Sequence, residues 1–195
     1  ENEPLYAAIL VFNVKILPDA AEEAEDRKIP VFREKIIYHL VDEYLKWMHE
    51  EKEAREKSEF DRLTRPAKVK ILSGYIFRKA KPAIVGVDVL AGKIQPKVRL
   101  VTVEGKEVGE VLQIQEKGEA ISAAEAGKQV AISIDKPVVG RHFNEEDTLY
   151  VEIPEEHVKK LLAKFQDRLD PAELECLNEL IKIMRKTTPF WGSYQ

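Results

Sequence analysis

Residues 65–81 read Arg-Pro-Ala-Lys-Val-Lys-Ile-Leu-Ser-Gly-Tyr-Ile-Phe-Arg-Lys-Ala-Lys, and this stretch decides how the chain is divided. Pro66 is the first Pro or Gly after a long run of helix-forming residues, so a helix is expected to end just before it. From Lys68 to Phe77 the β-branched and aromatic side chains predict a strand. The stretch therefore marks a change from helix to sheet.

The same stretch is a local exception in charge. It carries six basic residues and no acid, whereas the whole chain has 31 basic and 35 acidic residues. Tyr75 and Phe77 lie among these cations. Basic side chains with interleaved aromatic rings are typical of surfaces that bind RNA ends. The alternative is a solvated strand face whose rings point into the core, and the residues alone leave both interpretations open.

Upstream of this stretch the sequence predicts a long helix over residues 33–65. Apolar residues between Ile36 and Met48 recur at spacings of three and four, and beyond Met48 the pattern is almost wholly polar. Glu51 and Arg55 form an i,i+4 pair in the favourable order, which supports a solvated helix. About 32 residues at about 1.5 Å each give a rod of roughly 48 Å. The alternative is a flexible charged linker, and a hinge is expected near Thr64–Pro66.

Residues 1–32 read as the end of an α/β domain whose beginning is absent. The apolar run Tyr6–Ile16 predicts a strand buried on both faces. No neighbouring strand is expected in this block, and an acidic loop is expected from Pro18 to Pro30.

Residues 66–153 predict a small closed β-barrel. Short strands at close spacing are separated by turns that contain Gly, and Val103–Glu107 has the pattern of a hairpin turn. The expected strands are Lys68–Phe77, Ala83–Leu90, Val98–Val103, Glu107–Gln115, Gln129–Ile134 and Thr148–Ile153.

Residues 154–195 predict two helices, so the fold class is α+β: a long connecting helix, a β-barrel and a C-terminal helix pair. Pro154 suits the first position of one helix, and Asp170-Pro171 suits the N-cap and first position of the other. The second helix has two adjoining apolar stripes over roughly half its circumference, at about 100° per residue. Either the barrel and the first helix cover this arc, or part of it accepts a partner's tail. The candidate partner-binding residues are Leu174, Leu177, Leu180, Ile181 and Met184.

No catalytic or metal-binding motif is present. The phosphate loop G-x-x-x-x-G-K-[ST] is absent, the four histidines lie far apart, and Cys176 lies in an apolar stripe as a core residue would. We therefore expect no enzyme activity, no metal and no cofactor in this chain. The lone cysteine, a first segment without basic residues and the lack of an apolar run of about 20 residues indicate a cytoplasmic protein outside the membrane. Many Lys and Glu with few labile residues are typical of hot environments.

Four stretches together resemble one known family. They are Ile36–Trp47, Ile71–Arg78 with Pro82–Val87, Val139–Phe143 and Thr188–Gly192. In this order they are similar to the C-terminal part of archaeal and eukaryotic translation initiation factor 5B, which is related to bacterial initiation factor 2. The resemblance covers nearly the whole chain, and the composition favours an archaeal member.

The resemblance implies a function. The GTPase domain of such factors would lie outside these residues, so GTP and Mg²⁺ are expected only in the full-length factor. Its final barrel would engage the aminoacylated acceptor end of initiator tRNA on the ribosome and promote subunit joining. Its terminal helices would bind the C-terminal tail of initiation factor 1A. The alternatives are a non-enzymatic RNA-binding barrel of another translational GTPase and a scaffold module without RNA contact.

Within this interpretation, cations would bind phosphates and a ring would stack on the terminal adenine or pack on the aminoacyl group. Phe190 and Trp191 are expected to cap the helix pair. The candidate RNA-binding residues are Tyr75, Phe77, Arg78, Lys79, Arg141 and His142.

Overall fold

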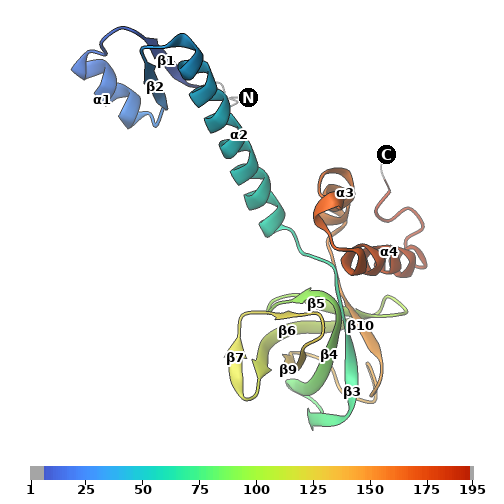
Figure 1. The fold of residues 1–195 in the computed structure, drawn as a ribbon. Coiled ribbons are helices and arrows are strands. Elements are labelled where there is room, and N and C mark those ends of the chain that lie inside the picture. Colours follow the sequence, from blue (N-terminus) through green and yellow to red (C-terminus); the bar gives the residue numbers. More distant parts are fainter. Residues whose placement is uncertain (1–6, 194–195) are drawn as a thin grey trace. The chain divides into compact units, whose positions relative to one another are not determined.

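The computed structural model describes residues 7–193 of the chain (Figure 1). The chain divides into two compact units, with the boundary in the sequence between Arg62 and Leu63, and each unit is described by itself. In the described range, no helix combines the length and the apolar character that a membrane span requires.

The first unit contains a small parallel sheet. Strand β1 (Ile9–Phe12) pairs with β2 (Val31–Glu34), and α1 (Pro18–Asp26) connects them. Two expectations for this region were therefore wrong: the block does supply a neighbouring strand, and most of the expected acidic loop is a helix. The helix forms because Pro18 occupies a first-turn position and the residues that follow are mainly Ala and Glu, which are strong helix formers.

Burial of β1 also differs from expectation. Val11 is buried, but Leu10 and Phe12 are 47% and 45% exposed. The strand expected over Tyr6–Ile16 is therefore shorter and is not covered on both faces by the described residues. Tyr6 lies outside the described residues.

The long helix is confirmed, but it begins later and ends earlier than the expected 33–65. Helix α2 spans Ile37–Arg62, because the chain from Val31 to Glu34 is still part of β2. Its 26 residues correspond to a length of about 39 Å at 1.5 Å per residue. Its first half packs on the sheet through the rings of Phe32, Tyr44 and Trp47, whose centroids lie 5.5–6.0 Å apart. Its second half is mostly solvated, and the expected pair joins Arg55 Nε to Glu51 Oε1 at 3.0 Å.

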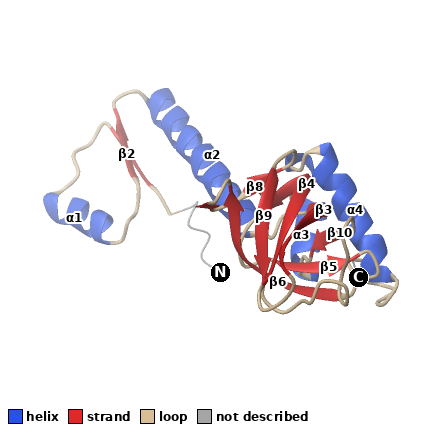
Figure 2. Cartoon of the chain, turned by 90° about the horizontal axis from the view of Figure 1, so that it is seen from below, coloured by secondary structure: helices blue, strands red, loops and turns tan. Residues whose placement is uncertain are grey.

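The second unit is built on a six-stranded closed barrel, as expected. Neighbouring strands pair in the ring order β3-β10-β5-β6-β9-β4, and β4 pairs back with β3, always antiparallel. Inward side chains such as Ile71, Val85 and Ile132 are fully buried. Figure 2 shows the barrel strands from a second side. The strands are β3 (Ala67–Arg78), β4 (Ala83–Ile94), β5 (Arg99–Thr102), β6 (Glu107–Glu116), β9 (Gln129–Ile134) and β10 (Thr148–Val151), with two short additions, β7 (Glu119–Ile121) and β8 (Ala124–Glu125).

Two helices follow the barrel. Helix α3 (Glu155–Lys164) begins one residue after Pro154, which is its N-cap rather than its first helical residue, and a short 3₁₀ turn, η2 (Gln166–Arg168), leads to α4 (Pro171–Arg185). Asp170 caps α4 as expected. Its Oδ1 accepts the Glu173 N–H at 2.8 Å, while Glu173 Oε2 accepts the Asp170 N–H at 3.1 Å. Helix α4 packs against β3 and β4.

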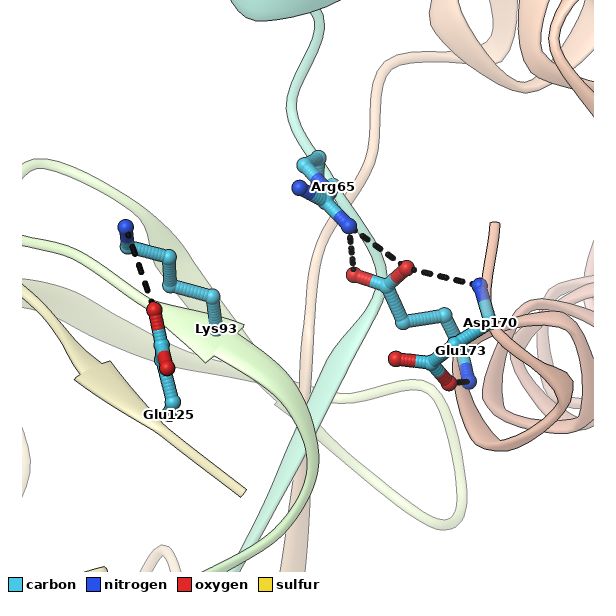
Figure 3. A network of polar contacts seen from close by, with 5 residues as sticks. All are labelled: Arg65, Lys93, Glu125, Asp170 and Glu173. Atoms are coloured by element: carbon cyan, nitrogen blue, oxygen red, sulfur yellow. Dashed lines mark hydrogen bonds and ion pairs between the residues drawn. The ribbon is translucent and has the colours of Figure 1, made fainter. Parts of the chain in front are cut away.

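The chain between α2 and β3 is fastened to this helix pair. Arg65 donates to both carboxylate oxygens of Glu173, at 2.5 and 2.6 Å, and Glu173 is only 1% exposed (Figure 3). The Thr64 N–H donates to Nδ1 of His157 at 3.0 Å. These contacts argue against the hinge expected at Thr64–Pro66, because moving the segment would expose or unpair a buried carboxylate.

A second polar contact joins the first residues of β3 to α4. Lys68 Nζ and the Tyr150 hydroxyl both donate to Glu179 Oε2, at 2.8 and 3.0 Å. Burial raises the pKa of the Glu179 carboxyl, but these two donors outweigh it and hold the pKa below its ordinary value. The helix pair is therefore attached to the barrel at charged as well as apolar contacts.

We expect Arg65→Ala to destabilise the second unit by about 3 kcal/mol, because it leaves a buried carboxylate without its cation. This loss of stability is at the lower end of the range for breaking a buried ion pair, because the Arg65 side chain is 35% exposed. Urea unfolding of the chain, followed by the amide signals of barrel residues, measures it.

The matched control is Lys93→Ala. Lys93 and Glu125 also form an ion pair (Figure 3), but at 3.6 Å and with 37% and 70% of the two side chains exposed. Its loss is expected to cost under about 1 kcal/mol. Equal effects of the two variants would contradict the structural role of the Arg65–Glu173 pair.

Candidate nucleic-acid interface

The barrel has an open hollow beside the last residues of β3. Tyr75 and Phe77 are 55% and 64% exposed there, and their ring centroids lie 6.4 Å apart in an edge-to-face arrangement. The interpretation in which these rings point into the core is therefore wrong. The hollow has a volume of about 560 Å³ and is lined by Leu72, Tyr75, Phe77, Ile84, Gly86, Gln115, Lys117, Gly118, Gln129, Val130 and Ala131.

An irregularity in β3 places Tyr75 on the outside. The register between β3 and β4 shifts between Ile71 and Ile76, and Gly74 adopts φ +77°, a conformation that favours glycine. Ser73 Oγ donates to Glu145 Oε2 at 2.8 Å, which fixes the irregular segment from outside. The bulge therefore turns this part of the strand from barrel wall into ligand-accessible surface.

Gly86 allows Tyr75 to lie close to β4. A Cβ at position 86 would lie 2.7 Å from the Tyr75 Cβ, closer than such atoms approach. The missing side chain thus lets the Tyr75 side chain pack on the backbone of β4, where its ring lines the hollow next to Ile84. Gly86 belongs to the stretch Pro82–Val87 that carried the family resemblance.

The polar part of the lining was not expected from the sequence. Gln115 lies on β6, Lys117 in the turn after it, and Gln129 on β9. These residues lie about 40 or more positions from Tyr75 along the chain, and only the ring order of the strands brings them together. An apolar floor, two rings and a few amide and ammonium groups suit a nucleobase or another small flat group.

The four basic candidates lie outside the hollow, on exposed surface. Arg78 ends β3 and Lys79 follows it, whereas Arg141 and His142 belong to the loop before β10. The backbone joins the two segments: Val139 N–H donates to the Lys79 carbonyl at 3.0 Å, and Ala80 bridges with Val138. The structure thus brings the segments together without placing these four side chains in the hollow.

His142 stabilises its own loop. Its Nδ1 accepts the Val138 N–H at 3.0 Å, and its backbone N–H donates to the Val138 carbonyl at 3.1 Å. The first bond orients the ring, and in the neutral ring it leaves the other nitrogen as the donor.

The candidate partner-binding residues on α4 divide into two groups. Leu177, Leu180 and Ile181 are buried in the second unit, at 0%, 1% and 7% exposure. Leu174 and Met184 are partly exposed. The chain itself covers most of the wide apolar arc, and the remaining accessible part lies at Leu174 and Met184.

Of the two residues expected to cap the helix pair, Phe190 and Trp191, only Trp191 is buried. Trp191 is buried, and its carbonyl accepts from Arg185 Nε at 2.9 Å. Phe190 is 82% exposed and so does not cap the helices.

Neither a metal-binding cluster nor a reactive cysteine is found among the described residues. Among residues 7–193, no cluster of three or more His, Cys, Asp or Glu side chains could hold a metal ion. Cys176 is buried in α4, and burial raises the pKa of its thiol to about 12, so it is a protonated core residue.

The barrel is of the class found in translation factors. Residues 65–150 match the family model "Elongation factor Tu domain 4", and residues 1–45 match the model "Translation-initiation factor 2". The barrel class and the initiation-factor match thus fall on different parts of the same chain.

Matches over nearly the whole of this chain specify the family. The chain is 45% identical over 194 residues to a probable translation initiation factor IF-2 of Methanoculleus marisnigri and 46% identical over 188 residues to that of Ignicoccus hospitalis. These matches cover 98% and 96% of this chain but 33% and 31% of the relatives, so the chain spans about a third of their length. The structure of GDP-bound aIF5B from Aeropyrum pernix matches with a TM-score of 0.67 and 40% identity, over 95% of this chain and 31% of that one.

The chain belongs to the archaeal translation initiation factor IF-2 (aIF5B) family and corresponds to its C-terminal region. It is thus the C-terminal part of a translational GTPase family member.

Proposed function

We propose that the barrel of this chain binds the aminoacylated acceptor end of initiator tRNA on the ribosome and so promotes joining of the ribosomal subunits. The observation that carries the proposal is the hollow beside Tyr75 and Phe77, which combines two exposed rings with an apolar floor. A single-stranded RNA end can insert an unstacked base or an attached aminoacyl group into such a hollow. Such a factor would act in the cytoplasm, where ribosomes are.

The surrounding cations extend this surface. Arg78 and Lys79 follow the rings directly, and the hydrogen-bonded loop carries Arg141 and His142 beside them. In the proposal these groups contact phosphates of the acceptor strand, while the rings contact the terminal base or the methionyl group. Gln115 and Gln129 supply the hydrogen-bonding groups that can distinguish one base edge from another.

GTP and Mg²⁺ belong to the GTPase domain of the longer factor in this proposal. The barrel then serves as its RNA-binding end, and α2 as a stiff connection that transmits a tilt from that domain. A scaffold role without RNA contact is the alternative, and the experiment on the rings separates the two.

We expect Phe77→Ala to weaken binding of a methionylated acceptor-stem minihelix by about 5- to 150-fold, since a stacked ring contributes about 1–3 kcal/mol. Fluorescence anisotropy of a labelled minihelix measures the affinity. The matched control is Phe190→Ala, which removes an even more exposed ring, 82% against 64% for Phe77, from the turn after α4. In the same assay, the double variant Arg78→Ala with Arg141→Ala should reduce the slope of log affinity against log salt concentration by about 1.4–1.8. Unchanged affinity and unchanged salt slope would refute the assignment.

We further propose that α4 receives the C-terminal tail of initiation factor 1A at Leu174 and Met184. The observation that favours this contact is partial exposure of these two apolar side chains above the buried Leu177, Leu180 and Ile181. A short apolar tail can lie on such a strip, with the buried residues holding the helix rigid beneath it.

Titration of a tail peptide should shift the amide signals of α4 and leave those around Tyr75 unchanged. Leu174→Ser with Met184→Ser should abolish the shifts without unfolding the chain, because both side chains are already partly exposed. Leu112→Ser, at a 49% exposed apolar residue of β6, is the control. Shifts confined to the barrel, or retained in the double variant, would defeat this second proposal.

A further inference from the structure

The first unit has a hollow at the carboxyl ends of its two parallel strands. β1 ends at Phe12 and β2 at Glu34, and the residues at and just after these ends surround a volume of about 740 Å³. In sheets with parallel strands, this edge is where ligands characteristically bind. The hollow is lined by Asn13, Val14, Lys15, Arg33, Glu34, Lys35 and Ile36.

The lining is strongly basic. Lys15, Arg33 and Lys35 stand against the single acid Glu34, and all three cations are exposed. Among residues 7–193, no hydrogen bond or ion pair occupies the side chains of these three cations. Glu34 turns toward the neighbouring backbone instead, where its Oε2 accepts the Lys35 N–H at 3.3 Å.

One of these cations, Lys35, lies where the electrostatics of a helix disfavours it. Helix α2 begins at Ile37, and its first turn holds no acidic residue. The positive end of a helix favours anions, so Lys35 two positions before it is unfavourable in the isolated chain. Departures from such local preferences are expected at functional or strained sites.

We propose that this hollow binds a phosphate group of an RNA backbone. Three cations on two chain segments fit an oxyanion that carries its charge on several oxygens, and Arg33 can bind two of them at once. The hollow is open, which a backbone phosphate between two nucleotides requires. Free phosphate offers the same chemistry and is separated from RNA by the test. This contact is independent of the barrel's proposed role, since it lies in the other unit.

Amide signals of the isotope-labelled 195-residue chain, assigned by NMR, test the proposal in two arms. One arm titrates a short oligouridylate and the other inorganic phosphate. Oligouridylate is expected to shift the signals of residues 13–15 and 33–36 at concentrations where phosphate has no effect. Shifts with phosphate alone would keep the anion site but overturn its assignment to RNA. The barrel signals around Tyr75 form a separate readout, so failure at one site is distinguishable from failure at the other.

Lys15→Gln with Lys35→Gln is expected to reduce the slope of log affinity for oligouridylate against log salt concentration by about 1.4. The same variant is expected to lower that affinity at least tenfold at low salt. The matched control, Lys46→Gln with Lys52→Gln, removes the same charge from exposed positions on α2. Unshifted signals outside the hollow show that each variant is folded. The proposal is overturned if neither titrant shifts residues 13–15 and 33–36, or if the control variant loses as much as the test variant.

Discussion

The buried carboxylate of Glu173 is the point on which the second unit depends. It accepts from Arg65 just after the long helix and from the backbone of Asp170 at the start of α4, while it is itself almost fully excluded from water. A buried charge is tolerated only when its partners stay in place, so the pair fixes the relation between β3 and α4. Thr64 and Lys68 add contacts to the same helix pair on either side of Arg65. The first residues of the unit are therefore held as one rigid piece with its C-terminal helices.

This constraint divides β3 into two functional parts. Its first residues are occupied by the contacts with α4, whereas Tyr75 and Phe77 near its end are exposed. From Lys68 to Phe77 the strand covers roughly 30 Å at about 3.3 Å per residue. An RNA end at the rings and a peptide on α4 can therefore occupy the unit together.

Much of this organisation could be predicted from the sequence, and the failures have physical reasons. The six strands, the closed barrel and the Asp170 cap follow from local patterns: alternation, Gly-containing turns and capping chemistry. The helix at Pro18–Asp26 was missed because acidic composition suggested a loop, although Ala and Glu favour a helix. The exposure of Tyr75 could not be decided locally, because it depends on a bulge in β3 and on Gly86 across the ladder. Gln115 and Gln129 join the site only through barrel closure, and no local pattern indicates it.

The central claim is that an acceptor end binds the barrel at the end of β3 while the helix pair stays unchanged. Mapping the amide signals of the chain during titration with a methionylated minihelix tests it most directly. The account predicts shifts at Tyr75, Phe77, Gln115 and Gln129 and none along α4. Shifts along α4 with none around the two rings would contradict it.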